Sequence, residues 1–154
     1  MQVNIYTDGS SRGNPGPGGY GVVLIATKHH KELSGGFRKT TNNRMELLAV
    51  ITALESLKLT GLHVTIHTDS KYVCDAVDKK WVFGWEKKNF AGKKNADLWK
   101  RFLELYPKNH ISFKWIKGHN GHKENERCDV LATMAADDSK NLLIDEGFES
   151  GLYN

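Results

Sequence analysis

The 154 residues suit one folded domain, and 39% hydrophobic with 26% charged residues is an ordinary globular composition. Two cysteines are too few for a disulfide framework, and no apolar run is long enough to cross a bilayer, which argues against secreted and membrane proteins. The net charge of +4 is unevenly spread: residues 79–117 hold 11 basic against 3 acidic side chains, which indicates either a polyanionic partner or a solvated lysine face.

The first forty residues predict three antiparallel strands. Alternation over residues 2–8 and a β-branched apolar run over residues 20–27 indicate two strands, separated by a Gly- and Pro-rich turn at residues 10–19. Residues 29–40 predict a third strand, whose paired glycines suggest a bulge or the close approach of another backbone. Because the links are short, we expect a meander.

After residue 40 the hydrophobic period changes from that of a strand to that of a helix. The elements predicted next are a helix over residues 43–59 ended by Gly61, a strand over 62–68, a short helix over 70–77, a helix over 95–106 ended by Pro107, a strand over 110–117 and a helix over 125–136. The fourth and fifth strands are joined through helices and should therefore run parallel. The whole predicts an α/β fold with a five-stranded mixed sheet and helices on both faces.

Two segments lie outside this pattern. Residues 79–94 have poor core periodicity and indicate a basic protrusion, and residues 137–154 form an acidic tail with the composition of a flexible segment, whose order the sequence leaves open. We expect both to belong to a single domain spanning residues 1–154.

Four carboxylates occupy positions where such a fold converges. Asp8 ends the first predicted strand and Asp69 ends the fourth, its neighbour in the sheet. Glu46 lies in the first turn of the first long helix, and Asp129 lies in the first turns of the last one. Clustered carboxylates must be protonated or metal-bound, and hard oxygen ligands suit Mg²⁺ or Mn²⁺.

Each acid also has a purely structural explanation. Asp8 precedes a glycine, which is a common turn pair, and Asp69 is placed to cap the next helix. Glu46 stands three residues after Asn43, the spacing of a capping box. Asp129 suits the positive end of a helix dipole. The spacing alone leaves both interpretations open.

A polar loop at residues 118–128 precedes the last helix. Its histidines, His119 and His122, suit a mobile acid–base group. Together with Cys128 they are also zinc-ligand types, although there is no CxxC motif and the two cysteines exclude Cys₄ and Cys₃His sites.

The protrusion interleaves aromatic and basic side chains, which is typical of nucleic-acid contact. The residues are Trp81, Trp85 and Phe90 with Lys79, Lys80, Lys87, Lys88, Lys93 and Lys94. The tryptophans stand four residues apart, so they also suit a short helix anchored on the body, and we expect them to be half packed and half exposed.

Four long motifs stand out in the chain: YTDGSSRGNPGPGGYG at residues 6–21, TTNNRMEL at 40–47, TDSKYV at 68–73 and GHNGHKENERCD at 118–129. Their sequences and order resemble the bacterial type 1 ribonuclease H family, and the likeness extends from residue 2 to about residue 136. The resemblance implies three antiparallel strands followed by two parallel ones, and endonucleolytic cleavage of the RNA strand of an RNA–DNA hybrid with two Mg²⁺ or Mn²⁺ ions. The low cysteine count and the absence of a long apolar run favour a reducing compartment, so we expect a cytoplasmic protein, and we expect it to be a monomer.

By the same resemblance, Asp8, Glu46, Asp69 and Asp129 match the family's metal-binding acids, and His119 matches the family's loop histidine. We expect Asp8 to be the bridging ligand, because the end of a central strand is the most rigid place for it. His119 is better placed to carry protons or aid product release than to be a fixed ligand. The positions that match substrate contacts are Asn14, Asn42 and Asn43 in the hybrid groove, Lys39 and Thr41 at a DNA phosphate, Lys71 where some relatives carry glutamine, and Trp81, Trp85, Lys87, Lys88, Lys93 and Lys94 in the protrusion. The protrusion is several residues shorter than in the longest relatives, and Phe90 replaces a frequent tryptophan.

Two further functions are compatible with such a scaffold. A non-catalytic hybrid-binding module would keep the protrusion and could lose any one acid, whereas this chain keeps all four. A DNA nuclease of the same fold, such as an integrase or resolvase, is disfavoured through the resemblance, by the three groove asparagines.

Overall fold

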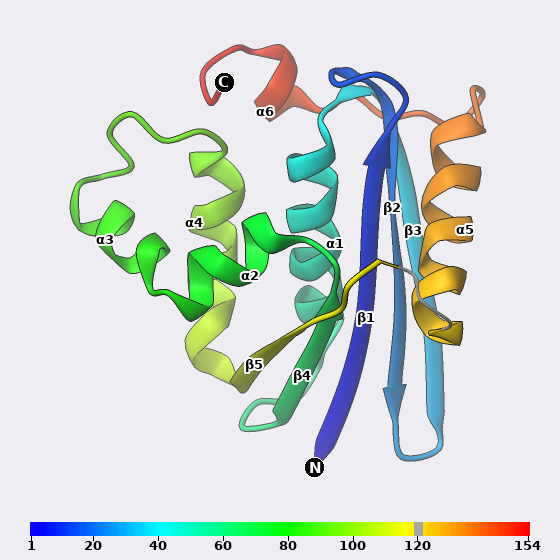
Figure 1. Ribbon diagram of the computed structural model, residues 1–154, viewed down its shortest axis with the longest axis vertical. Helices are drawn as coiled ribbons and strands as arrows, with labels where there is room; N and C mark the ends of the chain where they lie inside the picture. The colour runs from blue at the N-terminus through cyan, green and yellow to red at the C-terminus, as the bar shows by residue number, and fades with distance from the viewer. Residues whose placement is uncertain (119–121) are drawn as a thin grey trace.

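A computed structural model describes residues 1–118 and 122–154 (Figure 1). The strands are β1 Gln2–Ser11, β2 Gly16–Ala26, β3 His29–Thr40, β4 His63–Thr68 and β5 His110–Trp115. The helices are α1 Asn42–Glu55, α2 Lys71–Asp78, α3 Trp81–Lys87, α4 Ala96–Leu105, the 3₁₀ turn η1 Tyr106–Lys108, α5 Lys123–Asp137 and α6 Glu146–Glu149. No described helix is both long and apolar enough to cross a membrane.

The described strands form one mixed sheet in the order β3-β2-β1-β4-β5. β1, β2 and β3 pair antiparallel, while β4 runs parallel to both β1 and β5. Helix α5 packs against β1, β2 and β3 on one face, and α1 covers the other face, with α4 beyond it (Figure 1). The predicted α/β architecture and strand directions are confirmed.

The turn between the first two strands is shorter than predicted, because several of its glycines lie inside the sheet. β1 continues to Ser11 and β2 already begins at Gly16. A Cβ atom at Gly19 would overlap the carbonyl oxygen of Ala132, and one at Gly36 would overlap that of Ala135. These glycines let α5 lie directly on the strands, so they serve helix packing rather than a turn. The register of β2 and β3 shifts between Gly16 and Gly18, which pair with Thr40 and Phe37, so the extra residue lies in β3 beyond its paired glycines. The close approach expected at those glycines is confirmed at Gly36.

The helix boundaries differ from prediction by up to four residues. α1 ends at Glu55, where the hydroxyl of Ser56 donates to the carbonyl of Ala53 at 2.6 Å, so the predicted continuation to residue 59 is wrong. α4 ends at Leu105, and Pro107 lies within the 3₁₀ turn that follows. The basic protrusion contains helix α3, whose Val82 is fully buried.

A buried arginine joins four segments that are distant in sequence. Arg44, in the first turn of α1, has 2% of its surface exposed. Its guanidinium donates to both carboxylate oxygens of Asp97 at 2.9 and 2.7 Å and to both of Asp145 at 2.8 and 3.0 Å. It also donates to the side-chain oxygen of Asn95 at 3.2 Å, while Thr40 donates to Asp145 at 2.7 Å. All five guanidinium N–H groups are thereby used.

The acidic tail after α5 makes specific contacts with the body. Leu143 forms a parallel bridge with Phe37 and extends the edge of β3. Arg38 pairs with Glu149 at 2.8 Å, and Asp145 completes the Arg44 cluster. The tail therefore covers one end of the sheet, where it meets the start of α1 (Figure 1).

Replacing Arg44 should test the weight of this cluster. In the Arg44→Ala variant two carboxylates lose their buried cation, and we expect the free energy of unfolding to fall by about 3–5 kcal/mol in urea titrations. Arg101→Ala is the matched control, because Arg101 and its partner Glu55 are both exposed; its loss should stay below about 1 kcal/mol. Equal losses in the two variants would show that the Arg44 cluster is not a structural centre.

Candidate active site

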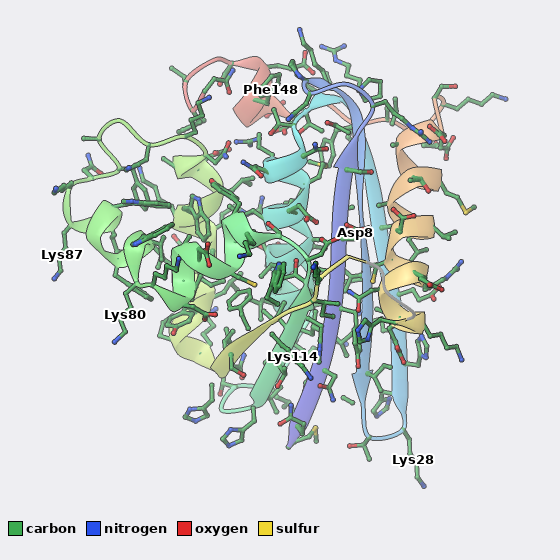
Figure 2. All side chains as sticks on the ribbon, viewed as in Figure 1. Asp8, Lys28, Lys80, Lys87, Lys114 and Phe148 are labelled. Carbon is green, nitrogen blue, oxygen red and sulfur yellow. The ribbon has the colours of Figure 1, made fainter. Side chains whose placement is uncertain are left out.

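The four predicted acids line one pocket of about 390 Å³, formed where β1 runs on past the end of β4. Asp8 comes from β1, Glu46 from α1, Asp129 from α5, and Asp69 from the residue that follows β4. The rest of the lining is Gly9, Ser10, Asn42, Asn43, Ser70, Lys71 and Tyr72. Figure 2 places Asp8 on the central strand, between the helices of the two faces.

The local structure corrects how two of these acids were placed. Asp8 does not end β1: it pairs with Gly21 inside the strand, two residues beyond the last β1–β4 pair at Tyr6. Glu46 lies at the start of the second turn of α1 rather than in the first.

The capping explanations for the acids are wrong. Thr41, not Asn43, is the N-cap of α1, and its hydroxyl accepts a hydrogen bond from the backbone N–H of Arg44 at 3.3 Å. Ser70, not Asp69, caps α2 by accepting from Val73 at 3.2 Å.

Asp8, Glu46 and Asp69 form a tight group. One carboxylate oxygen of each lies within 4.8 Å of the others, while Asp129 lines the same pocket outside this group. A Cβ atom at Gly9 would overlap the backbone of Met45, so only glycine there lets β1 approach α1 closely enough to bring Asp8 beside Glu46. The Gly9 N–H donates to the Asp8 carboxylate at 2.9 Å.

Glu46 is the electrostatically strained member of the group. Its side chain is buried, and this burial, together with the charges of Asp8 and Asp69, raises its pKa well above the usual value. Its Oε1 atom is buried without a hydrogen-bond partner among the described residues. An orphaned carboxylate oxygen between two further carboxylates is the donor set that a hard divalent cation fits.

Two of the predicted asparagines, Asn42 and Asn43, line the pocket, and Asn14 bonds to the first of them. The side-chain oxygen of Asn42 accepts from the backbone N–H of Ser11 at 2.7 Å, and that of Asn14 accepts from the backbone N–H of Asn42 at 3.2 Å. Their oxygens are thus engaged within the protein, and the amide N–H groups are the donors that remain for a ligand. Asn43 lines the pocket directly, whereas Lys39 is exposed on β3 and does not line it.

The aromatic residues of the protrusion divide between packing and exposure, as predicted. Trp85 is partly buried and packs edge-on against Trp99, with ring centroids 5.9 Å apart, while 48% of Trp81 is exposed. Phe90 is buried and serves packing. The ammonium of Lys93 lies 5.2 Å from the Trp85 ring.

The basic side chains of the protrusion lie away from the acids. Lys87, Lys88 and Lys94 are exposed, and Lys87 points outward, well away from Asp8 (Figure 2).

The zinc alternative is not supported. Cys128 is fully buried, its thiol donates to the carbonyl of Tyr6 at 3.1 Å, and burial raises its pKa to about 12. Among residues 1–118 and 122–154 the group of acids around Asp8 is the metal-ligand cluster found. His119 lies outside the described residues.

Tyr72 is a lining residue that sequence reasoning missed. Its hydroxyl accepts from the indole N–H of Trp99 at 2.9 Å and from the amide of Asn95 at 3.1 Å, and Asn95 also contacts Arg44. The pocket wall is therefore tied to the buried arginine. The only available signal was its place in TDSKYV, beside Lys71.

Comparison with known proteins identifies the family. The family model for RNase H matches residues 1–137. The chain belongs to the ribonuclease H family. It is 52% identical over 153 residues to the Ribonuclease H of Nitratidesulfovibrio vulgaris, covering 96% of this chain and 97% of that one. It is 55% identical over 140 residues to the Ribonuclease H of Syntrophus aciditrophicus, covering 88% and 80% of the two chains.

Solved structures of ribonucleases H agree with the fold. LC9-RNase H1, a type 1 RNase H with the type 2 active-site motif, superposes with a TM-score of 0.80 at 30% identity, covering 98% of this chain and 81% of that one. LC11-RNase H1, solved in complex with an RNA/DNA hybrid, superposes with a TM-score of 0.69 at 28% identity, covering 90% and 99%.

Glu46 generates a prediction for the metal-free protein. Because its folded pKa lies above the unfolded value near 4.5, stability falls as the pH rises through the window between the two values. In EDTA at pH 7, Glu46→Gln should therefore raise the free energy of unfolding by at least about 1 kcal/mol, and the gain should vanish below about pH 4. The exposed Glu104 gives the matched control, Glu104→Gln. A gain that is equal at both pH values in urea titrations would contradict the charge argument.

Proposed function

We propose that this ribonuclease H hydrolyses the RNA strand of RNA–DNA hybrids at the acid pocket, with two Mg²⁺ or Mn²⁺ ions held by Asp8, Glu46, Asp69 and Asp129. The observation that carries the proposal is the convergence of three carboxylates within 4.8 Å in a chain of this family. A hybrid as substrate is supported by LC11-RNase H1, whose structure contains one. The DNA-nuclease and binding-module alternatives have no observation in their favour.

The acids are suited to holding cations because rigid elements carry them. Asp8 sits on the central strand, with its carboxylate held by the Gly9 N–H, and Glu46 is fixed by the packing of α1. When bound, divalent ions activate a water molecule and neutralise the charge that develops on the leaving 3′-oxygen. In this assignment Asp8 would contribute to holding both ions, Glu46 and Asp69 would hold the one on the side of the attacking water, and Asp129 would hold the other. His119 acts as proton carrier or aids product release.

Selection of RNA requires groups that recognise the sugar, because chemistry at a phosphate is blind to sequence and sugar alike. The 2′-hydroxyls lie in the wide minor groove of an A-like helix. The side chains of Asn42 and Asn43 line the pocket, and Asn14 is bonded to Asn42, so their amide N–H groups can meet hydroxyls there.

The DNA strand is assigned to the other basic and hydroxyl groups. Thr41 keeps its own hydroxyl hydrogen after capping α1, and Lys39 lies two residues before it on β3. The exposed lysines around Trp81 and Trp85 carry the sequence-independent part of binding. Location in the cytoplasm and a monomeric state remain predictions from the sequence.

Asp8→Asn tests the catalytic assignment. We expect the purified protein to cut an end-labelled RNA–DNA hybrid with Mg²⁺ and not in EDTA, to spare double-stranded DNA, and to bind double-stranded RNA without efficient cleavage. Asp8→Asn should abolish cleavage while circular dichroism shows a native fold, because it removes an ion ligand but no core contact. Efficient cutting of DNA duplex under the same conditions would instead favour the DNA-nuclease alternative.

Removing the protrusion's charge tests its role. In the combined variant of Lys87, Lys88, Lys93 and Lys94 to Ala, each lost phosphate contact should lower the log–log slope of hybrid binding against salt by about 0.9. The maximal rate should change little, since these side chains lie away from the acids. Lys28→Ala, in the β2–β3 turn at the far end of the sheet, is the control (Figure 2). An unchanged slope in the combined variant would show a merely solvated face.

A further inference from the structure

Trp115 is a large side chain that the fold leaves half uncovered beside the pocket. It is the last residue of β5, paired with Thr68, and 42% of its surface is exposed. It shares its strand face with Phe113, which packs against Phe102 of α4 in the core. A core-facing position therefore ends in an exposed indole immediately next to Asp69.

The indole makes two contacts with residues of the pocket. Its N–H donates to the backbone carbonyl of Asp69 at 3.1 Å, and its ring lies 4.8 Å from the ammonium of Lys71. The neighbouring Ile116 N–H donates to the carbonyl of Thr68 at 2.8 Å. These two hydrogen bonds from the end of β5 fix the main chain at Asp69, and the indole ring also contacts the ammonium of Lys71.

Lys71 is the basic residue among the described residues that line this pocket. Among the described residues that line the pocket, four are acidic and Lys71 is the one cation. A polyanion that approaches four carboxylates needs a positive charge beside them, and a freely moving lysine loses side-chain entropy when it is fixed there. A ring that holds the ammonium within cation–π distance fixes this charge at the rim.

We propose that Trp115 is a positioning residue of the ribonuclease. Its ring presents Lys71 to a backbone phosphate of the strand that is cut, next to the scissile one, and its N–H fixes the main chain of Asp69. The inference rests on the proposed function, since it requires a nucleic-acid backbone at the acid pocket.

Two variants separate the two contacts. Trp115→Phe keeps an aromatic face for Lys71 but removes the N–H, whereas Trp115→Leu removes both. Hybrid binding is measured in EDTA by fluorescence anisotropy as a function of salt, and kcat and KM are measured with Mg²⁺. Because hybrid binding is measured in EDTA, the affinities and salt slopes do not depend on bound metal.

For Trp115→Phe we expect unchanged hybrid affinity and salt slope and a kcat lowered about tenfold, the usual weight of one hydrogen bond at such a point. Lys71→Ala should lower the salt slope by about 0.9. Trp115→Leu should weaken binding about threefold, the weight of an exposed cation–π contact.

The combination of variants decides the proposal. In the Lys71→Ala background, Trp115→Leu should cause no further loss of affinity, whereas in the Lys28→Ala control background the threefold loss should persist. Additive losses in the Lys71→Ala background would overturn the proposal, because Trp115 would then act on the hybrid without Lys71. A wild-type kcat for Trp115→Phe would overturn the assigned hold on Asp69. If the unsubstituted protein cuts no hybrid, the proposed function fails instead, so the two failures are distinguishable.

Discussion

The buried guanidinium of Arg44 is the interaction on which the arrangement around the pocket depends. Burial alone would lower the pKa of Arg44, but its bonds to Asp97 and Asp145 outweigh that effect and raise it. Burial likewise opposes the charge of Asp145, and its bonds to Arg44 and Thr40 lower its pKa. Each of these charges is stable inside the protein only because the opposite charges are buried beside it. The end of β3, the first turns of α1 and α4, and the tail are thereby held together, and through Asn95 and Tyr72 the pocket wall is held with them.

Helix α1 carries a second buried ionisable side chain, Glu46, which, unlike Arg44, is not surrounded by groups of opposite charge. Arg44 and Glu46 are two residues apart, so they point to different sides of the helix. Arg44 meets two carboxylates and all its donors are used, whereas Glu46 meets two further carboxylates and one of its oxygens has no described partner. The first cluster is complete within the protein and serves stability. The second is incomplete and gains from a cation, so the same helix secures the scaffold on one side and prepares a ligand site on the other.

Local periodicity was sufficient to predict the strands, the long helices and the parallel pairing of the fourth and fifth strands. It failed where a residue type served a distant partner. The glycines around Gly19 were interpreted as a turn, although they provide space for the carbonyls of α5. Arg44 looked like one more polar residue of a helix, because Asp97 and Asp145 lie 53 and 101 residues further along the chain. Alternation predicted the fifth strand but gives no sign that the core ends before Trp115, which is 42% exposed.

The four acids were easier to find than their surroundings, for a physical reason. Strand ends and helix starts can be located from sequence to within a few residues, and a sheet of this topology brings them to one edge. Asp8, Asp69, Glu46 and Asp129 could therefore be grouped from the sequence, although Asp8 lies inside β1 and Glu46 in the second turn of α1. What makes the group reactive is not local. It requires Gly9 to let β1 approach α1, the core to bury Glu46, and β5 to fasten Asp69. The acids supply the ligands for the chemistry at this pocket. Their positions depend on other residues, which can be recognised only by the partners that they contact in the folded chain.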